Sequence, residues 1–524
     1  MIDHQQIRFL SDIPAAQART RGDAVALEFE GRTTTYAALN ARSQAAAGLL
    51  LSLGVEAGDR VAWLSRNCDT FFEVFFGATL IRACLAPINF RLAQSEITFI
   101  LNDSEATLFF VSPEFLEMAD AIVAGLERKV RLISLGAAQL GHPAYEALRD
   151  AAAPIGTDHP APQADDDVLQ LYTSGTTGLP KGVRLVNANY ACFLEVSPQI
   201  EGFNYQGDEV VLIVMPLFHV AGTNVSFAGL AHGCRVIVVA DFAPAAVLDL
   251  VATEKVAHVF IVPSMIQMLL QHPRIEQTDL SSLKSIAYGA SPISEAVLAA
   301  AKAAFGCQFI QFYGMTESSG AGSFLSPLAH EGDKLRSCGL PWPTLEVRIC
   351  GEAGPRGPEA AVREVGQIAI RGGAVMRGYW NRPEATAETI IDGWLLTGDA
   401  GYRDEDGYFY IHDRVKDMIV TGGENVYPAE VENAIFGCPG IADAAVIGVP
   451  SDRWGEEVKA VVVCKPGEAP TAAEVIAYAR GRIAGYKAPK SVEFIDALPR
   501  NASGKVLRRE LRAQYWAGRD RAIG

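Results

Sequence analysis

The pattern of apolar and polar positions differs between two parts of the chain. In the first part, residues 24–29 and 60–64 form continuous apolar runs, and the apolar residues between them recur at the spacing of one helix face. Further predicted strands, most of them rich in Val, Ile and Phe, are residues 107–111, 210–215, 236–240, 258–262 and 285–288. Such strands suit a sheet that helices cover on both faces. The pattern predicts an α/β fold, a large body of layered, mainly parallel sheets.

The second part begins after about residue 340, where strands become short and their turns rich in glycine. Predicted strands lie at residues 346–349, 366–370, 407–411 and 417–420, which indicates a β-rich subdomain. From residue 428 a compact pattern follows, with helices at 429–436 and 472–484 and strands at 444–449, 458–464 and 492–495. The polar segment 413–417 is the predicted junction. We therefore expect an N-terminal domain over residues 1–413 and a small α+β domain over 414–524.

Length and composition narrow the class of protein. The chain has 524 residues, 49% of them hydrophobic and 20% charged, which excludes disorder as the main state. The formal net charge is −16, so we expect no nucleic-acid polymer as a partner. A polyanion can still bind where a few cations and backbone N–H groups converge.

The location is predicted to be cytoplasmic. Nine scattered cysteines, with no C-x-x-C pair and no cluster at zinc spacing, are typical of reduced thiols. The sequence has no 18-residue apolar run, no secretory signal at its start and no peroxisomal address at its end. We expect no integral membrane association.

One glycine- and hydroxyl-rich segment favours phosphate binding. It runs from residue 171 to 182 as Leu-Tyr-Thr-Ser-Gly-Thr-Thr-Gly-Leu-Pro-Lys-Gly and is not a Walker A motif. Glycines allow close backbone approach, so successive N–H groups and hydroxyls can surround phosphate oxygens while the lysine adds charge. The candidate residues are Thr173, Ser174, Gly175, Thr176, Thr177, Gly178 and Lys181. Taken alone, such a segment is more often a solvated turn of Ser, Thr and Gly.

The segment does not stand alone, because five more motifs follow it in order. They are Tyr-Gly-Met-Thr-Glu at 313–317, Gly-Trp-Leu-Leu-Thr-Gly-Asp at 393–399, Asp-Arg-Val-Lys-Asp-Met-Ile at 413–419, Gly-Gly-Glu-Asn-Val-Tyr-Pro at 422–428 and Pro-Arg-Asn-Ala-Ser-Gly-Lys at 499–505. In this order they resemble the AMP-forming adenylating enzymes, which include acyl-CoA synthetases, peptide-synthetase adenylation domains and luciferases. The resemblance covers nearly the whole chain.

The resemblance implies an ATP site assembled from these motifs. Tyr313 would contact adenine, Asp399 the ribose hydroxyls, and Arg414 the ribose or α-phosphate, while Thr316 would touch phosphate. Glu317, with Thr176, would hold Mg²⁺, a cation that prefers oxygen donors. The remaining expected ATP-site residues are Gly289, Ala290, Ser291, Gln311, Phe312 and Gly314.

His219 ends the apolar run 210–218, a position that faces a cleft or is filled by a satisfied core histidine. The resemblance places it against the substrate carboxylate, in an acyl pocket with Val220, Asn224, Gly289, Gly314 and Met315. No general base is required, since a carboxylic acid is already ionised at neutral pH. Two departures from the common pattern bear on substrate choice: Tyr288 opens the segment 288–293, and Thr223 with Asn224 adds polarity to a wall that is usually apolar.

Lys505 is expected to be the principal catalytic residue, together with Thr316, Glu317 and His219. Its ammonium would stabilise the charge that builds on the α-phosphate as the carboxylate attacks. The resemblance also implies that the small domain rotates about a hinge at Lys416 between half-reactions. Gly422 and Gly423 would then border the tunnel for the pantetheine arm of coenzyme A.

The sequence thus predicts an acyl-CoA synthetase that uses ATP, Mg²⁺ and coenzyme A, with a fatty or other aliphatic acid favoured over an aryl or hydroxycinnamate acid. Three further classes stay open: a carrier-protein-loading adenylation enzyme, a luciferase-like oxygenase and a non-catalytic nucleotide-binding protein. Neither pattern nor resemblance sets the oligomeric state, and a homodimer is one alternative.

Overall fold

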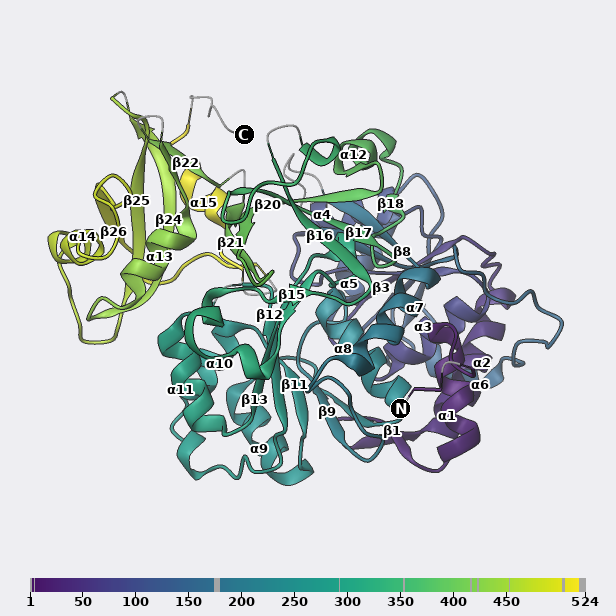
Figure 1. Cartoon of the computed structure of the whole chain (residues 1–524). Coiled ribbons are helices and arrows are strands. Elements are labelled where there is room, and N and C mark those ends of the chain that lie inside the picture. The colour runs from purple at the N-terminus through teal and green to yellow at the C-terminus, as the bar shows by residue number, and fades with distance from the viewer. Residues whose placement is uncertain are drawn as a thin grey trace.

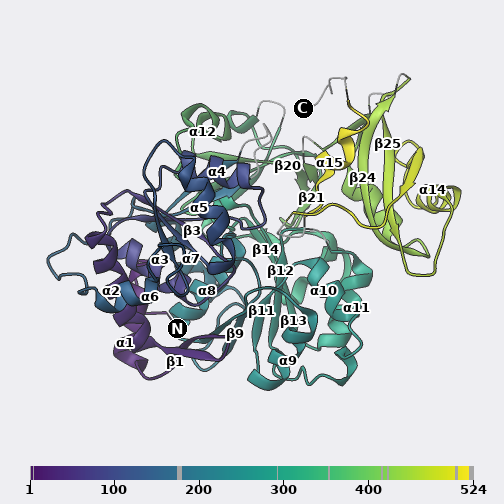
Figure 2. The same ribbon diagram turned by 180° about the vertical axis from the view of Figure 1, so that it is seen from behind.

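The computed structural model describes most of the chain and leaves short gaps at several motifs. It describes residues 2–3, 5–173, 180–291, 293–351, 354–414, 417–421, 424–451, 453–501 and 505–517, with only the backbone at 412–414 and 424–425. Figures 1 and 2 show a large body and, at one side of it, a smaller C-terminal unit, with α15 (Arg508–Ala513) between β24 (Ile441–Ser451) and β21 (Phe409–Arg414).

The largest sheet in the described chain has nine strands and a parallel centre. In spatial order they are β15 (Leu340–Pro341), β14 (Ser323–Leu325), β13 (Gln308–Tyr313), β12 (Ser285–Gly289), β11 (His258–Phe260), β9 (Val210–Ile213), β10 (Arg235–Val238), β1 (Val25–Phe29) and β2 (Arg32–Thr35). Strands β13 through β1 run parallel, and β14, β15 and β2 pair antiparallel at the edges. The connecting helices are α8 (Val220–His232), α9 (Pro244–Glu254), α10 (Pro263–Leu270) and α11 (Glu295–Phe305).

A second sheet of the described chain has seven strands. In order they are β18 (Gly378–Tyr379), β8 (Lys181–Val186), β7 (Asp167–Thr173), β4 (Cys84–Pro87), β3 (Arg60–Leu64), β5 (Leu108–Val111) and β6 (Arg131–Ser134). Its helices are α1 (Ile13–Arg21), α2 (Tyr36–Ser52), α3 (Thr70–Leu80), α4 (Gln94–Asp103), α5 (Leu116–Ala124), α6 (Tyr145–Ala151) and α7 (Asn187–Val196).

Aromatic packing joins the two sheets into one core. Helix α3 carries Phe71, Phe72, Phe75 and Phe76, all fully buried, and the Phe75 ring stacks on Phe227 of α8 at 4.6 Å between centroids. Each buried aromatic side chain contributes on the order of 2–3 kcal/mol of transfer free energy. Helix α3 therefore packs its aromatic side chains against α8 between the two sheets.

Two antiparallel sheets follow in the chain. The first contains β16 (Leu345–Cys350), β17 (Gly366–Gly372), β20 (Trp394–Arg403), β19 (Ile390–Ile391) and β21, with α12 (Pro383–Thr389) beside it. The second contains β23 (Glu424–Val426), β22 (Ile419–Thr421), β25 (Gly455–Cys464), β24 and β26 (Ser491–Phe494), with α13 (Pro428–Phe436), α14 (Ala472–Arg480) and α15.

Alternation along β24 explains why helices and loops cover both faces of the C-terminal sheet. Ala444 and Val446 pack with the cluster beneath α13 and α14. Ala445 and Ile447 pack instead with a cluster that includes Leu498. A strand with apolar residues on both faces requires cover on both faces.

The predicted fold class is confirmed, and several boundaries differ. The apolar run 210–218 is a strand only to Ile213, because the chain turns at Pro216, although the whole run is buried. The predicted helix 472–484 ends at Arg480, where Gly481 caps it. Strand β21 pairs through Arg414 with Asp399 of β20, so the expected division after residue 413 falls inside a strand and stays a prediction. Among the described residues, no helix is long and apolar enough to cross a membrane.

Candidate functional site

Two neighbouring parallel strands, β12 and β13, end side by side and bring the first candidate residues together. Gly289 is paired with Phe312, and a Cβ at position 289 would lie 2.4 Å from the Phe312 carbonyl oxygen. Ala290 follows with a φ of 65°. Gly314 follows β13, and a Cβ there would lie 2.3 Å from the carbonyl oxygen of Gly320. Ligands of parallel sheets bind at the carboxyl ends of strands, which makes this edge the candidate site.

The Glu317 carboxylate lies in the loop after β13 and is held from a distant strand. The Tyr379 hydroxyl donates to Glu317 Oε1 at 2.9 Å, and the Thr173 hydroxyl approaches the same oxygen at 3.5 Å. The backbone N–H of Met376 donates to the Glu317 carbonyl oxygen at 2.8 Å. Glu317 is buried and neighbours Thr316, so the structure brings Thr173, Thr316 and Glu317 together as expected.

Lys181 and Thr173 face each other across the hairpin of β7 and β8. The Lys181 ammonium lies over the Tyr379 ring, 4.9 Å from its centroid, an arrangement that holds a cation on an aromatic face. Tyr379 therefore contacts both the lysine and the glutamate. The predicted residues Ser174, Gly175, Thr176, Thr177 and Gly178 lie outside the described residues.

Tyr313 and Asp399 meet at the edge of the β-rich sheet. The Tyr313 hydroxyl donates to Asp399 Oδ2 at 2.8 Å. Burial, with the neighbouring Asp399 carboxylate, raises the pKa of Tyr313 well above its ordinary value, so the phenol stays protonated as a donor. Asp399 follows Gly398, whose φ is 75°, and pairs through its backbone with Arg414. This places both residues expected near the ribose on adjacent strands.

Another predicted ATP-site residue, Gln311, is held from a neighbouring strand. Its Oε1 accepts from the Tyr288 hydroxyl at 3.2 Å, and Tyr288 also contacts His330. The departure at Tyr288 thus positions Gln311. Ser291, two residues after Gly289, lies in the bend beyond β12 and is partly buried.

The start of α8 forms the wall expected for the acyl pocket. His219 is its N-cap residue, and His219 Nε2 is buried with no hydrogen-bond partner among the described residues. Burial, with some help from the Arg91 charge, lowers the pKa of His219 to about 4, so the imidazole is neutral at pH 7. A neutral imidazole brings no positive charge to the substrate carboxylate, and the place of His219 in an acyl pocket stays a prediction.

Val220, Asn224 and Gly314 converge on Gly320. The Asn224 NH₂ group donates to the Ser319 carbonyl oxygen at 2.8 Å, and a Cβ at Gly320 would lie 3.0 Å from that nitrogen and 3.3 Å from Val220 Cγ2. Asn224 is only 7% exposed, and its Oδ1 has no donor within the described part of the chain. Met315, which precedes Thr316, is partly buried in the same loop.

Lys505 lies in the C-terminal unit, next to Asn501. Its backbone N–H donates to Asn501 Oδ1 at 2.8 Å, and its carbonyl oxygen accepts from the Asn501 N–H at 2.8 Å. Lys416, Gly422 and Gly423 lie outside the described residues, as does the side chain of Arg414.

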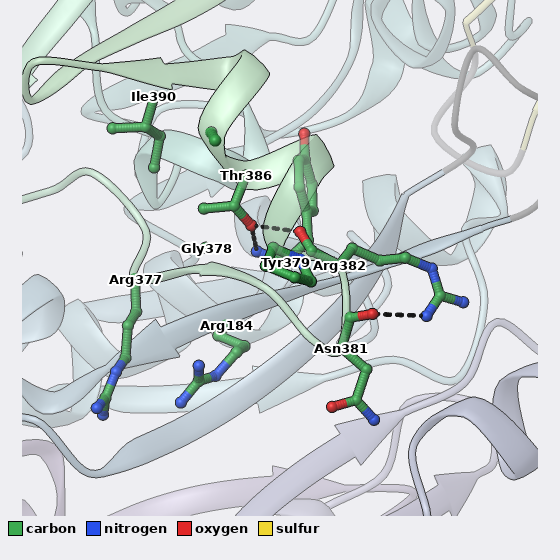
Figure 3. Close-up of a pocket in the computed structure, with 10 residues that line it drawn as sticks. Arg184, Arg377, Gly378, Tyr379, Asn381, Arg382, Thr386 and Ile390 are labelled. Atoms are coloured by element: carbon green, nitrogen blue, oxygen red, sulfur yellow. Dashed lines mark hydrogen bonds between the residues drawn. The ribbon is translucent and has the colours of Figure 1, made fainter.

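A cavity of about 460 Å³ beside β18 and α12 carries three arginines (Figure 3). Arg184 and Arg377 extend side by side, and Arg382 points the other way. Arg184 is paired with Asp167 and Arg382 with Asp103, while Arg377 donates to the Asp165 carbonyl oxygen. These contacts hold the strand that carries Tyr379, and we assign the arginines a structural role.

Sequence reasoning missed Tyr379 and Ser319. Both lie outside the quoted motifs, and Tyr379 reaches Glu317 across 62 residues of sequence. The Ser319 hydroxyl donates to the Ala374 carbonyl oxygen at 2.8 Å, and the Ser319 carbonyl oxygen accepts from the Asn224 amide. The backbone of Ser319 has a φ of 54°. Only the position of Ser319 two residues after Glu317 was a signal.

The donor set fits a magnesium ion that is shared with a ligand. Among the described residues, no group of three or more His, Cys, Asp or Glu could hold a metal unaided. Glu317 offers one buried carboxylate whose Oε1 is oriented by two hydroxyls. Mg²⁺ usually takes one or two protein carboxylates and completes its shell with phosphate oxygens and water.

Family models and known proteins were compared with the chain. Residues 14–380 match the model described as AMP-binding enzyme, and residues 430–505 match the one described as AMP-binding enzyme C-terminal domain. The chain is 42% identical over 509 residues to a feruloyl-CoA synthase of an Amycolatopsis species, which covers 97% of this chain and 99% of that protein. It is 37% identical over 529 residues to the fatty acid–[acyl-carrier-protein] ligase ScoC of Streptomyces coeruleorubidus, with 100% and 99% covered.

Solved structures agree with this family. ATP-bound MatB from Rhodopseudomonas palustris superposes with a TM-score of 0.87 at 30% identity, covering 96% of this chain and 99% of that one. Both family models, the motif order and the clustered site residues lead to one conclusion. The chain belongs to the AMP-binding enzyme family and is an AMP-forming acyl-CoA synthetase, which uses ATP and coenzyme A to activate a fatty or an aryl acid.

Proposed function

We propose that this synthetase activates an aromatic acid that carries a hydroxyl group, of the hydroxycinnamate type, in preference to an unsubstituted fatty acid. The observation that carries this proposal is the Asn224 amide. Because the Ser319 carbonyl only accepts hydrogen bonds, the Asn224 NH₂ must face it, and Oδ1 is left without a donor. A buried acceptor without a partner costs roughly 1–3 kcal/mol. A substrate hydroxyl can relieve that cost, and an alkyl chain cannot.

A second polar atom on the same wall supports an aromatic acid. His219 Nε2 is also buried and unpartnered in the described chain, and the His219 ring lies against the Phe218 ring, 4.8 Å between centroids, so aromatic rings already pack at this end of α8. The 42% identity to a feruloyl-CoA synthase points to the same substrate class. The proposal thus departs from the fatty acid that the motifs alone favoured, which stays the alternative.

We further infer how the ATP-site residues share the chemistry. Glu317 would hold Mg²⁺, which supplies charge neutralisation at the phosphates. Lys181, placed by the Tyr379 ring, would add positive charge beside the loop of residues 174–178. Asp399, oriented by Tyr313, would accept from the ribose hydroxyls. Attack by the ionised substrate carboxylate on the α-phosphate releases pyrophosphate and leaves an acyl-adenylate.

The small domain would serve the two half-reactions in turn. Lys505 is the group we propose to stabilise charge on the α-phosphate during adenylation. For the second half-reaction, residues 414–524 would rotate about Lys416, and Gly422 and Gly423 would border the path of the CoA thiol to the acyl carbon. Rotation about a few residues is a common way to exchange two surfaces at one site.

A substrate panel tests the proposal directly. Pyrophosphate release is measured for 4-hydroxycinnamate, for cinnamate and for octanoate, in the native protein and in Asn224→Leu. We expect the hydroxyl to raise kcat/KM about 5- to 100-fold over cinnamate, from the cost of the unpaired acceptor. Asn224→Leu should remove that preference and leave cinnamate activated.

The matched control is Thr223→Val. Thr223 lies next to Asn224, but its hydroxyl donates within its own helix, to the carbonyl oxygen of Val220 at 3.2 Å. Its loss should leave the hydroxyl preference unchanged. If octanoate is activated with a higher kcat/KM than either aromatic acid, the proposed substrate class is wrong.

A further inference from the structure

Four charged side chains in the C-terminal unit form one network. Asp417 Oδ1 lies 3.0 Å from Arg512 NH1, and Asp417 Oδ2 lies 3.8 Å from Arg508 NH1. Arg508 also donates from NH2 to both oxygens of Glu432, at 2.9 and 2.8 Å. Glu432, on α13, accepts in addition from the Val446 N–H at 2.7 Å. The network therefore joins the start of the unit, α13, β24 and α15.

These residues lie near two functionally important positions that the sequence predicts, the hinge and Lys505. Asp417 is the first described residue after the expected hinge at Lys416. Arg508 and Arg512 lie on α15, the helix that follows Lys505. One end of the network thus sits at the hinge, and the other sits three residues beyond the lysine.

The residues on either side of Lys505 contact each other and pack on the same sheet. Arg500 pairs with Val506, and the Leu507 N–H donates to the Pro499 carbonyl oxygen at 2.8 Å. Val506 and Leu511 pack on the apolar face of β24 and β25. Only two residues, Val506 and Leu507, separate Lys505 from α15, and both are held by these contacts. An interaction that holds α15 in place therefore also restricts the position of Lys505.

We propose that Asp417 is a positioning residue that couples the hinge to Lys505. Its ion pairs with Arg508 and Arg512 fasten the segment after the hinge to the helix after the lysine, so that rotation of the small domain carries Lys505 to a fixed place. Side-chain exposure of 15–17% for these three residues shields the pairs from water, in contrast with most surface ion pairs. This inference rests on the role proposed above for Lys505.

The test separates the two half-reactions. Single-turnover pyrophosphate release measures adenylation, and thioester formation from a pre-made acyl-adenylate with CoA measures the second step. We expect Asp417→Asn and Arg512→Gln each to slow pyrophosphate release about tenfold or more, because a misplaced charge loses transition-state stabilisation. Thioester formation, which does not need Lys505, should stay near the native rate. The double exchange of Asp417→Arg with Arg512→Asp should restore much of the loss.

The matched control is Glu430→Gln. Glu430 lies on the same helix as Glu432 and pairs with Lys487 at 2.7 Å, with side-chain exposure of 29% for Glu430 and 22% for Lys487. None of the contacts described for Glu430 reaches a residue near the expected hinge. Glu430→Gln should lower the melting temperature about as much as Asp417→Asn and leave pyrophosphate release unchanged.

Three results would overturn the inference. They are equal loss in both half-reactions, no loss in either, and failure of the exchanged pair to restore adenylation. Lys505→Ala, run in the same assay, separates the two proposals. If it leaves pyrophosphate release intact, the role of Lys505 is wrong and the coupling falls with it. If it abolishes release while Asp417→Asn does not, the coupling alone is wrong.

Discussion

Replacing Tyr379 with phenylalanine tests how the Glu317 carboxylate is held. The change removes the 2.9 Å hydrogen bond from the hydroxyl to Glu317 Oε1 and keeps the ring beneath Lys181. What remains on that oxygen is the longer approach of Thr173, at 3.5 Å. The carboxylate would then sample orientations that do not present it to a metal. The lysine would stay in place, so the substitution isolates one function of the tyrosine.

The magnitude follows from the kind of bond that is lost. A hydrogen bond to a charged group is worth roughly 1.5–3 kcal/mol. At about 1.4 kcal/mol per decade, kcat/KM for ATP should fall roughly 10- to 150-fold. The loss should be greatest at low Mg²⁺ and should shrink as Mg²⁺ is raised, since excess metal compensates for a weakened site by mass action.

The assay is pyrophosphate release over a matrix of ATP and Mg²⁺ concentrations. Tyr145→Phe is the control, because it removes a buried tyrosine hydroxyl bond to another carboxylate, Glu73, at 3.2 Å, remote in the chain from every site residue. It should cost stability and leave the Mg²⁺ dependence unchanged. A Tyr379→Phe enzyme with the native Mg²⁺ dependence would refute the assignment of Glu317 as the metal-holding group.

Three more predictions concern the rest of the site. Tyr313→Phe removes the 2.8 Å bond to Asp399 and should raise KM for ATP about tenfold; an unchanged KM would show that Asp399 needs no orientation. Gly314→Ala places a methyl group against the Gly320 carbonyl oxygen, and this overpacking should cost roughly 1–3 kcal/mol and lower the melting temperature by several degrees. A melting temperature equal to that of the native protein would contradict the close approach. The pKa of His219 is lowered to about 4 in the folded protein, below its value in the unfolded chain, so the free energy of unfolding should fall as the pH drops from roughly 6.5 towards 4. Pyrophosphate release should show no acid limb near pH 6.5, roughly the usual histidine pKa. An acid limb there that disappears in His219→Gln would refute the burial argument.

Much of the fold follows from local pattern. Continuous apolar runs predicted the central strands, and helical spacing between the first two of them predicted the helix that the structure shows as α2. Both signals are local, so a single sequence carries them. Boundaries were less predictable where a turn interrupts an apolar stretch, as at Pro216, because burial continues after the strand has ended.

The site was predictable where a motif holds the chemistry and not where packing does. Thr173, Glu317 and Asp399 stand in motifs, and the structure brings Thr173 to Glu317. Tyr379 escaped prediction because its partner, Glu317, lies in a loop far away in the sequence, and its role arises only when β18 pairs with β8. Antiparallel pairing between segments so far apart has no local signature.

The loop from Gly314 to Gly320 would link the proposed choice of acid to the proposed role of Glu317. Three backbone and side-chain contacts fix it: Met376 N–H to the Glu317 carbonyl, the Ser319 hydroxyl to the Ala374 carbonyl, and Asn224 to the Ser319 carbonyl. The first two attach the loop to the strand region that carries Tyr379. The third attaches it to the acyl wall. The Asn224 amide supports the glutamate loop with its nitrogen and, in the proposed function, would offer its oxygen to the acid. A substrate that binds this oxygen would then also steady the loop that carries Glu317.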